Sequence, residues 1–301
     1  GTPDENWNKA VANEAFRRSM YYGLDLTKYW SRSNFIEPLH CENVAYTMKG
    51  LLYYSDGTDY ADKVTEMLGL PESDGKTPRR YDKAKAEEFK KQAMEELSAE
   101  GVTFPVVLDY YIISGDQNAL DKATVLKQVF AECLGEDFIT LNIKTFVSSQ
   151  SKEVVQPGLG SVYMVGWGAD YGDPANFLDQ ERYGYDQAYY SMNYSRVNNA
   201  TDEDLIATYK EFSEMTEKSG DIYEDMDARY DAYAEAEVYL LNHALTIPME
   251  YEVKWQLTKV NDYSRMNAMF GAQNYTYKNW ETSAEAYTAE QYETFKSEAG
   301  K

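Results

Sequence analysis

The clearest pattern of apolar and polar positions along the chain predicts a βαβ unit. Residues 102–113 form a nearly continuous apolar run, as expected of a strand that is buried on both faces. Residues 117–134 are typical of a helix that ends before Gly135, and residues 138–146 alternate like a second strand. A strand, a helix and a strand at this spacing predict two parallel neighbouring strands in one sheet.

Segments with helical spacing lie on both sides of this unit. The first covers residues 8–22, and the second begins after Asp82, a good N-cap, and runs to about residue 100. Toward the C-terminus, Thr201 and Asp204 form a capping-box signature before a third helix. A longer helix is expected over residues 223–245.

Two further segments, residues 161–168 and 249–257, are expected to be strands. The chain after residue 261 is polar, aromatic and irregular, and no internal repeat is present. Strands that alternate with helices in this order predict an α/β fold.

The charge of the chain excludes one class of function. The formal net charge is −22, and affinity for nucleic acid depends on Lys and Arg that neutralise phosphates, so we expect no nucleic-acid partner. No run of about 18 apolar residues occurs, which predicts the absence of a membrane-spanning helix. The start at Gly1, without a signal peptide or a lipid-acceptor cysteine, indicates a boundary inside a longer protein.

The residue types of metal sites and nucleophilic catalysis are sparse. Cys41 and Cys133 are far apart in the sequence, and a disulfide between them stays open. Cys133 lies on an apolar helix face and is expected to be a buried thiol. His40 precedes Cys41, but this pair supplies two of the four ligands that zinc usually takes, so we expect no metal and no cofactor. His243 lies on the long helix and is expected to be structural.

The most informative segment covers residues 166–178 and reads GWGADYGDPANFL. Gly166 and Gly168 flank Trp167, so the backbone carries no side chain at alternate residues and another chain can approach it closely. This edge could pair with the backbone of an extended peptide, and the carboxylate of Asp170 could hold the amino group of that peptide.

Other interpretations of this segment stay open from the residues alone. Asp170 and Asp173 could only organise the turn before Pro174, with Trp167 in the core. A calcium loop is a further interpretation, although the spacing of the carboxylates differs from that of an EF-hand. A carbohydrate-active enzyme would need two carboxylates across a sugar ring, which does not suit two residues of one turn.

The segment resembles the signature W-x-A-D-Y-x-D-P-x-x-F-L of the family-5 extracellular solute-binding proteins, which include oligopeptide- and dipeptide-binding proteins. Other stretches follow the order of the family, and the resemblance covers most of residues 8–260. These stretches are residues 14–18, 23–25, 80–86, 193–194, 204–205 and 234–248. Lys83 and Gly172 depart from the family pattern.

The resemblance implies a lobe of the periplasmic-binding-protein-like fold (type II, cluster C), with a mixed sheet flanked by helices. Residues 1–253 would form the second, C-terminal ligand-binding lobe of a longer protein. Residues 254–301 would return to the first lobe. Without that lobe, we expect this tail to be poorly ordered or packed in a non-native way.

The resemblance also implies a binding protein without catalytic activity. It would be the substrate-binding component of an ABC importer and would capture oligopeptides or dipeptides in a cleft between two lobes. The protein would be a monomer that delivers peptide to the permease subunits. It would lie in the periplasm or at the outer face of the bacterial membrane, held there by a lipid at an N-terminus outside this chain. Some family members take oligosaccharides or nickel chelates instead.

The site residues follow from the same resemblance. The backbone of Gly166, Trp167 and Gly168 would pair with the bound peptide. Asp170 would bind its amino group. The remaining two site residues, Tyr171 and Asp173, would shape the turn beneath.

Overall fold

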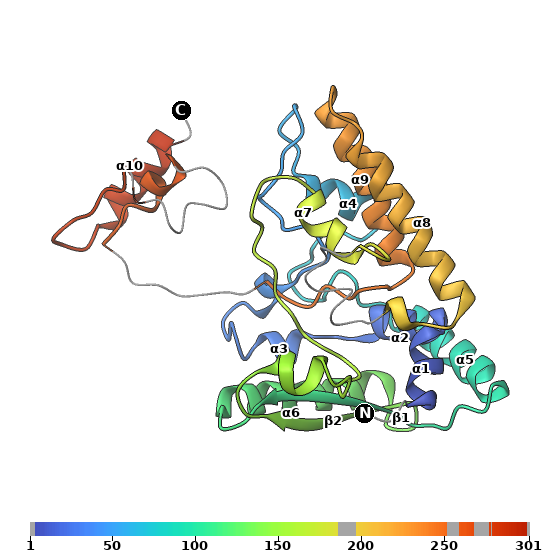
Figure 1. Ribbon diagram of the computed structural model, residues 1–301. Coiled ribbons are helices and arrows are strands. Elements are labelled where there is room, and N and C mark those ends of the chain that lie inside the picture. The colour runs from blue at the N-terminus through green and yellow to red at the C-terminus, as the bar shows by residue number, and fades with distance from the viewer. Residues whose placement is uncertain (1–3, 186–196, 252–258, 268–276, 278, 300–301) are drawn as a thin grey trace.

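The computed structural model describes residues 4–185, 197–251, 259–267, 277 and 279–299 (Figure 1). In these residues helices predominate around one small sheet. The helices are α1 (Glu5–Ala12), α2 (Glu14–Gly23), α3 (Thr27–Trp30), α4 (Tyr60–Met67), α5 (Lys83–Ala99), α6 (Gln117–Leu134), α7 (Ala175–Leu178), α8 (Glu203–Gly220), α9 (Met226–Asn242) and α10 (Ala289–Ala299). The strands are β1 (Val106–Ile113) and β2 (Ile139–Phe146).

The predicted βαβ unit is confirmed. β1 and β2 pair in parallel, from Val106 opposite Ile139 to Ile113 opposite Phe146, and α6 connects them. The side chain of Asp116 caps the start of α6, and the helix stops at Gly135, whose φ of 90° suits a residue without a Cβ.

The α/β fold is confirmed, but the two strands expected outside the βαβ unit are not formed in the described residues. Residues 161–168 contribute a single parallel bridge, between Val162 and Tyr110. Beyond Val162, the described residues of this segment form no further bridge, so the prediction of a strand over residues 161–168 was wrong. The described part of residues 249–257 contributes one antiparallel bridge, between Glu250 and Glu42, and the rest of that segment lies outside the described residues. The described sheet is therefore parallel rather than mixed.

Local capping changes two of the predicted helices: one is interrupted, and the other begins one residue later than expected. Residues 8–22 form two helices, since the side chain of Asn13 accepts a hydrogen bond from the Phe16 amide and begins α2. Arg17 stabilises the break by donating to the carbonyls of Val11 and Ala12. At α8 the N-cap is Asp202 instead of Thr201, because the Asp202 carboxylate accepts from the Leu205 amide.

The interior has two apolar clusters. The first lies between the sheet, α6 and the N-terminal helices, and it contains Phe16, Trp30, Leu108, Phe138 and Leu141. The second lies among α4, α7, α8 and α9, and it is rich in tyrosine. Its tyrosines are Tyr21, Tyr22, Tyr60, Tyr230 and Tyr233. In Figure 1, α8 and α9 run side by side along one edge of the molecule.

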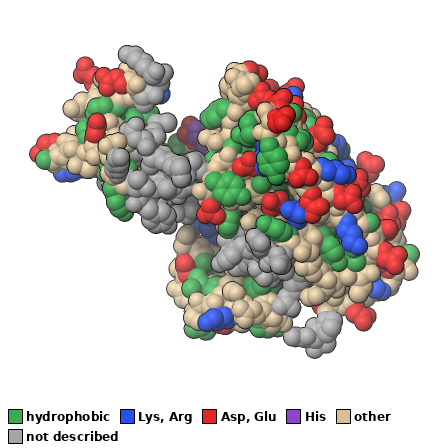
Figure 2. Space-filling model, turned by 45° about the horizontal axis from the view of Figure 1, so that its top comes forward, with side chains coloured by type: hydrophobic (Ala, Val, Ile, Leu, Met, Phe, Trp, Pro, Cys, Tyr) green, Lys and Arg blue, Asp and Glu red, His purple; other side chains and the backbone are tan. Residues whose placement is uncertain are grey.

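The cysteines and histidines take structural positions. Both Cys41 and Cys133 are free thiols; Cys41 is buried, whereas Cys133 is only partly buried against the first cluster. His243 caps the C-terminal end of α9, and its ring nitrogen Nδ1 lies 2.7 Å from a carboxylate oxygen of Glu14. Carboxylates are spread over the face drawn in Figure 2, with Lys and Arg side chains between them.

The C-terminal residues lie apart from the main body (Figure 1). Residues 259–264 contact residues 279–299: Val260 bridges Thr282, and the Tyr292 hydroxyl donates to Asp262. Much of residues 254–276 is outside the described residues, so the division at residues 253 and 254 stays a prediction. In the residues that the structure does describe, no helix has both the length and the apolar character needed to cross a bilayer.

Candidate functional site

Residues 165–172 run along one side of the molecule, between the sheet and α7 (Figure 1). Gly166 and Gly168 are exposed, and a Cβ built on either would meet nothing within 4 Å. Neither glycine has a positive φ, so neither the local backbone conformation nor packing within the described residues requires a glycine there. The backbone at these positions is bare toward solvent.

The side chain of Asn176 binds two residues of this segment, Trp167 and Asp170. The indole Nε1 of Trp167 donates to Oδ1 of Asn176 at 3.0 Å, and the backbone amide of Asp170 donates to the same oxygen at 2.9 Å. Asn176 is on α7 and is only 5% exposed. The ring of Trp167 is half-buried, whereas Asp170 and Tyr171 are exposed.

Asp173 is bound by the partly buried side chain of Arg229. Its two carboxylate oxygens accept from Nε and Nη2 of Arg229, each at 2.9 Å, and Oδ1 also accepts from the amide of Ala175. Arg229 additionally donates to three backbone carbonyls at the C-terminal end of α8 and just after it, those of Ser219, Gly220 and Ile222. The hydrogen bonds that Arg229 donates to Asp173 raise the pKa of Arg229. Both oxygens of Asp173 are therefore occupied within the turn.

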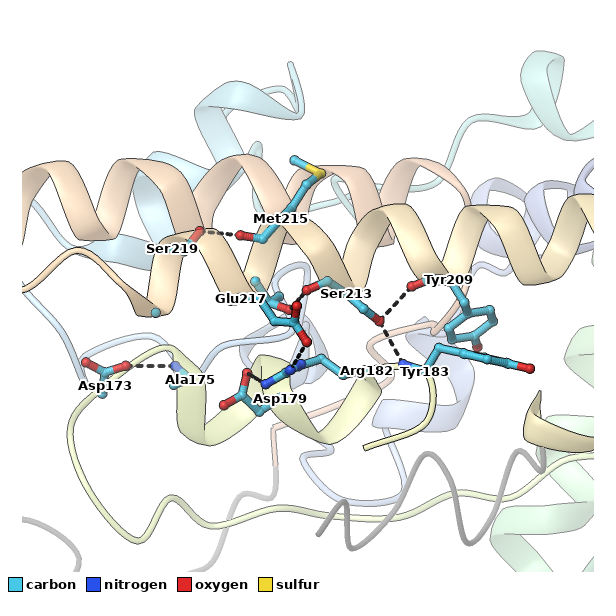
Figure 3. Close-up of polar contacts among 12 residues, drawn as sticks. Asp173, Ala175, Asp179, Arg182, Tyr183, Tyr209, Ser213, Met215, Glu217 and Ser219 are labelled. Atoms are coloured by element: carbon cyan, nitrogen blue, oxygen red, sulfur yellow. Dashed lines mark hydrogen bonds and ion pairs between the residues drawn. The ribbon is translucent and has the colours of Figure 1, made fainter. Parts of the chain in front are cut away.

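The chain after α7 is attached to α8 by polar contacts (Figure 3). Arg182 forms ion pairs with Asp179 and Glu217. The amide of Tyr183 donates to the hydroxyl of Ser213, which itself donates to the carbonyl of Tyr209. These contacts hold α7, and with it Asn176, against the second apolar cluster.

Two buried carboxyl groups lie behind α7. Glu237, with 0% exposure, accepts from the amides of Tyr46 and Thr47, from the Thr47 hydroxyl and from the Tyr60 hydroxyl. Glu181 accepts from the Tyr46 hydroxyl at 2.8 Å. Burial raises the pKa of Glu181 to about 7 and also raises the pKa of Glu237.

Sequence reasoning missed Asn176, Arg229 and Glu237. For Glu237 a signal was present, because it lies four residues after Tyr233 and four before Leu241, on the apolar face of α9. A carboxylate on such a face needs buried donors. Asn176 and Arg229 have no comparable signal. The partner of Arg229 is distant in the sequence, and the contact of Asn176 with Asp170 depends on the conformation of the loop between them.

The arrangement offers little for the alternative chemistries. Asp173 is paired through both oxygens with Arg229, which does not suit the second carboxylate of a glycosidase. His40 is paired with Glu37 at the surface while Cys41 is buried. In the ranges that the structure describes, no three His, Cys, Asp or Glu side chains gather as metal ligands.

Comparison with known proteins places the chain. Residues 5–189 match the profile of the bacterial extracellular solute-binding proteins, family 5 middle. The oligopeptide-binding protein AliA of Streptococcus pneumoniae is 26% identical over 272 residues, which are 80% of this chain and 38% of that protein. The oligopeptide-binding protein SarA of Streptococcus gordonii is 24% identical over 303 residues, which are 95% of this chain and 45% of that protein. The chain thus spans less than half the length of these curated relatives.

Solved structures share the fold. The pheromone receptor PrgZ superposes with a TM-score of 0.59 at 17% identity, covering 91% of this chain and 46% of that one. The Listeria monocytogenes protein OppA, solved with bound peptide, gives a TM-score of 0.55 at 19% identity over 80% of this chain and 39% of that one. Because the family profile matches more than half of its residues, this chain belongs to family 5 of the bacterial extracellular solute-binding proteins.

Proposed function

We propose that this chain is part of the peptide-capturing component of an ABC importer. The observation that carries the proposal is the exposed backbone of residues 166–168 beside the exposed carboxylate of Asp170. A bare backbone edge suits pairing with an extended peptide, and a free carboxylate suits a peptide amino group. The names of the relatives AliA and SarA as oligopeptide-binding proteins support the same ligand class.

The rest of the arrangement follows from the proposal. Residues 1–253 act as one ligand-binding lobe, and residues 254–301 cross to the other lobe. The protein works as a monomer outside the cytoplasm, either in the periplasm or lipid-anchored at the extracellular face of the cell membrane, and passes its peptide to the permease. It performs no catalysis. The backbone of Gly166, Trp167 and Gly168 pairs with the peptide, while Tyr171 and Asp173 shape the turn beneath it.

The first test identifies the ligand of the natural full-length protein. Native mass spectrometry after purification without denaturation is expected to show a ladder of peptide masses. A single oligosaccharide or nickel-chelate mass would retain the fold but reassign the ligand. A protein that carries no peptide and binds no added penta-alanine would overturn the proposed function.

The second test concerns the charge of Asp170. Asp170→Asn is expected to weaken binding of penta-alanine with a free amino group by about 10- to 100-fold, the usual worth of a charge-assisted hydrogen bond. Binding of N-acetylated penta-alanine should be unchanged. Asp204→Asn, which removes an exposed carboxylate on α8, is the matched control and should alter neither affinity. Calorimetric titration measures both, and an equal loss for both peptides would remove the role given to Asp170.

A further inference from the structure

The exposed segment 165–172 needs an internal support if it is to present a fixed shape to a ligand. The chain is attached to the sheet just before this segment, where the Ser161 amide donates to the carbonyl of Asp109 and Val162 bridges Tyr110. From Val165 to Gly172 most residues are exposed. An exposed backbone with few fixed contacts opens easily, and a ligand that orders it loses affinity in doing so.

Asn176 supplies a support in the middle of the segment. Its side-chain oxygen accepts hydrogen bonds from the indole N–H of Trp167 and from the backbone amide of Asp170. It therefore fixes the Trp167 ring and Asp170 relative to each other. A carbonyl oxygen has two acceptor positions, and both are used here. The side chain is 5% exposed, and a polar group so buried is tolerated because its hydrogen bonds are made.

Asn176 is itself held on a rigid base. The backbone amide of Asn176 donates to the backbone carbonyl of Asp173, and both carboxylate oxygens of Asp173 accept hydrogen bonds from Arg229. The next residues of α7, Phe177 and Leu178, are buried. The support therefore extends from α9 through Arg229 and Asp173 to the segment, and a residue that no ligand touches controls the position of residues that a ligand would touch.

We propose that Asn176 is a positioning residue of the peptide site. It pre-orients Trp167 and Asp170 before the peptide arrives, so that binding does not have to order them. This inference rests on the proposed function for the affinity that it affects, whereas the pre-orientation itself is measurable without any ligand.

The test uses the natural full-length protein and the variant Asn176→Ala. In the ligand-free protein, hydrogen exchange of the Asp170 amide should become about five- to tenfold faster, as expected for one lost hydrogen bond. Affinity for penta-alanine should fall by a similar factor. Asn176→Asp keeps the accepting oxygen and should restore both values toward the wild type.

Two controls separate positioning from general stability. Asn13→Ala removes the N-cap of α2, far from α7, and should lower the melting temperature without changing exchange at Asp170 or affinity. Trp167→Phe removes one of the two donors, so Asn176→Ala should cost less affinity in that background, a non-additivity expected of residues in contact.

The outcomes are distinguishable. Unchanged exchange at Asp170 in Asn176→Ala overturns the positioning role, and so does faster exchange with unchanged affinity. Wild-type protein that binds no peptide, with exchange altered as expected, overturns the proposed function and with it the affinity role of Asn176.

Discussion

The two halves of the interior provide hydrogen-bond partners for their buried backbone groups in different ways. Around β1, α6 and β2, regular backbone pairing satisfies the peptide groups, and the first cluster is built from apolar side chains. Around α7 and α9, long stretches without regular secondary structure pack against the helices. Their backbone amides donate to buried polar side chains instead of to other backbone groups. Glu237 accepts two backbone amides, Asp59 accepts the amides of Gly50 and Ala61, and Asn176 accepts that of Asp170.

The difference follows from the cost of an unpaired peptide group. A buried N–H without a partner costs about 1–3 kcal/mol, so irregular backbone enters the interior only beside an acceptor. The buried carboxylates Glu181 and Glu237 lie beside the second cluster, where the hydroxyls of Tyr46 and Tyr60 donate to them. We expect the stability of the second region to depend on individual buried polar atoms and on pH. The stability of the first region should depend instead on the volume of its apolar side chains.

The largest effect is expected from Glu237→Ala. The change leaves the buried amides of Tyr46 and Thr47 and two hydroxyls without their acceptor, and should lower the free energy of unfolding by about 3–5 kcal/mol. Urea unfolding measures it. Glu235→Ala, an exposed position on the same helix, is the control and should change little. A similar small change for Glu237→Ala would contradict the comparison.

A pH dependence centred on Glu181 comes next. Its carboxyl is buried beside Tyr46 and Tyr209, and its pKa is raised from 4.5 to about 7. Between these two pH values the folded state holds a proton that the unfolded state releases, so the contribution of Glu181 to stability is greatest below about pH 4.5 and is lost as pH rises to about 7. The loss is on the order of 3 kcal/mol. Above about pH 7 this contribution is constant.

Glu181→Gln isolates this contribution, because the amide does not titrate. The free energy of unfolding should fall less steeply between pH 4.5 and 7 in the variant than in the wild type. Glu237 titrates in the same direction in both proteins, so the difference between their curves reports Glu181 alone. Parallel curves would show that Glu181 is not the titrating group.

A smaller effect is expected from Arg229→Lys. Lysine keeps the charge but cannot bind both oxygens of Asp173 while donating to the carbonyls of Ser219, Gly220 and Ile222, so we expect a loss of about 2 kcal/mol. Arg32→Lys, in the exposed pair with Asp121, should change little. Chemical unfolding of both variants gives the comparison, and equal effects would show that the Asp173 contact is no stronger than a surface pair.

The candidate site was predictable from the sequence only in part. The segment 166–178 was recognisable as residues, and the glycines and Asp170 of its exposed edge could be read from their types. The support by Asn176 could not be read, because a small polar residue after Pro174 is equally suited to an exposed turn. The same limit applies to residues 161–168, which were expected to form a strand. Ser161 bonds to Asp109 of β1 and Val162 forms one bridge to Tyr110, but the rest of the segment forms no bridge in the described residues.

The sequence by itself determined what depends on near neighbours along the chain. The apolar runs of β1, α6 and β2, the capping by Asp82 and Asp116, and the end of α6 at Gly135 all act within a few residues, so their effect is visible as local pattern. The tertiary structure alone decided which distant groups meet. Arg229 reaches Asp173 across 56 residues, and Tyr46 reaches Glu181 across 135. Such contacts depend on how helices pack, and the sequence pattern around each partner carries no record of the other.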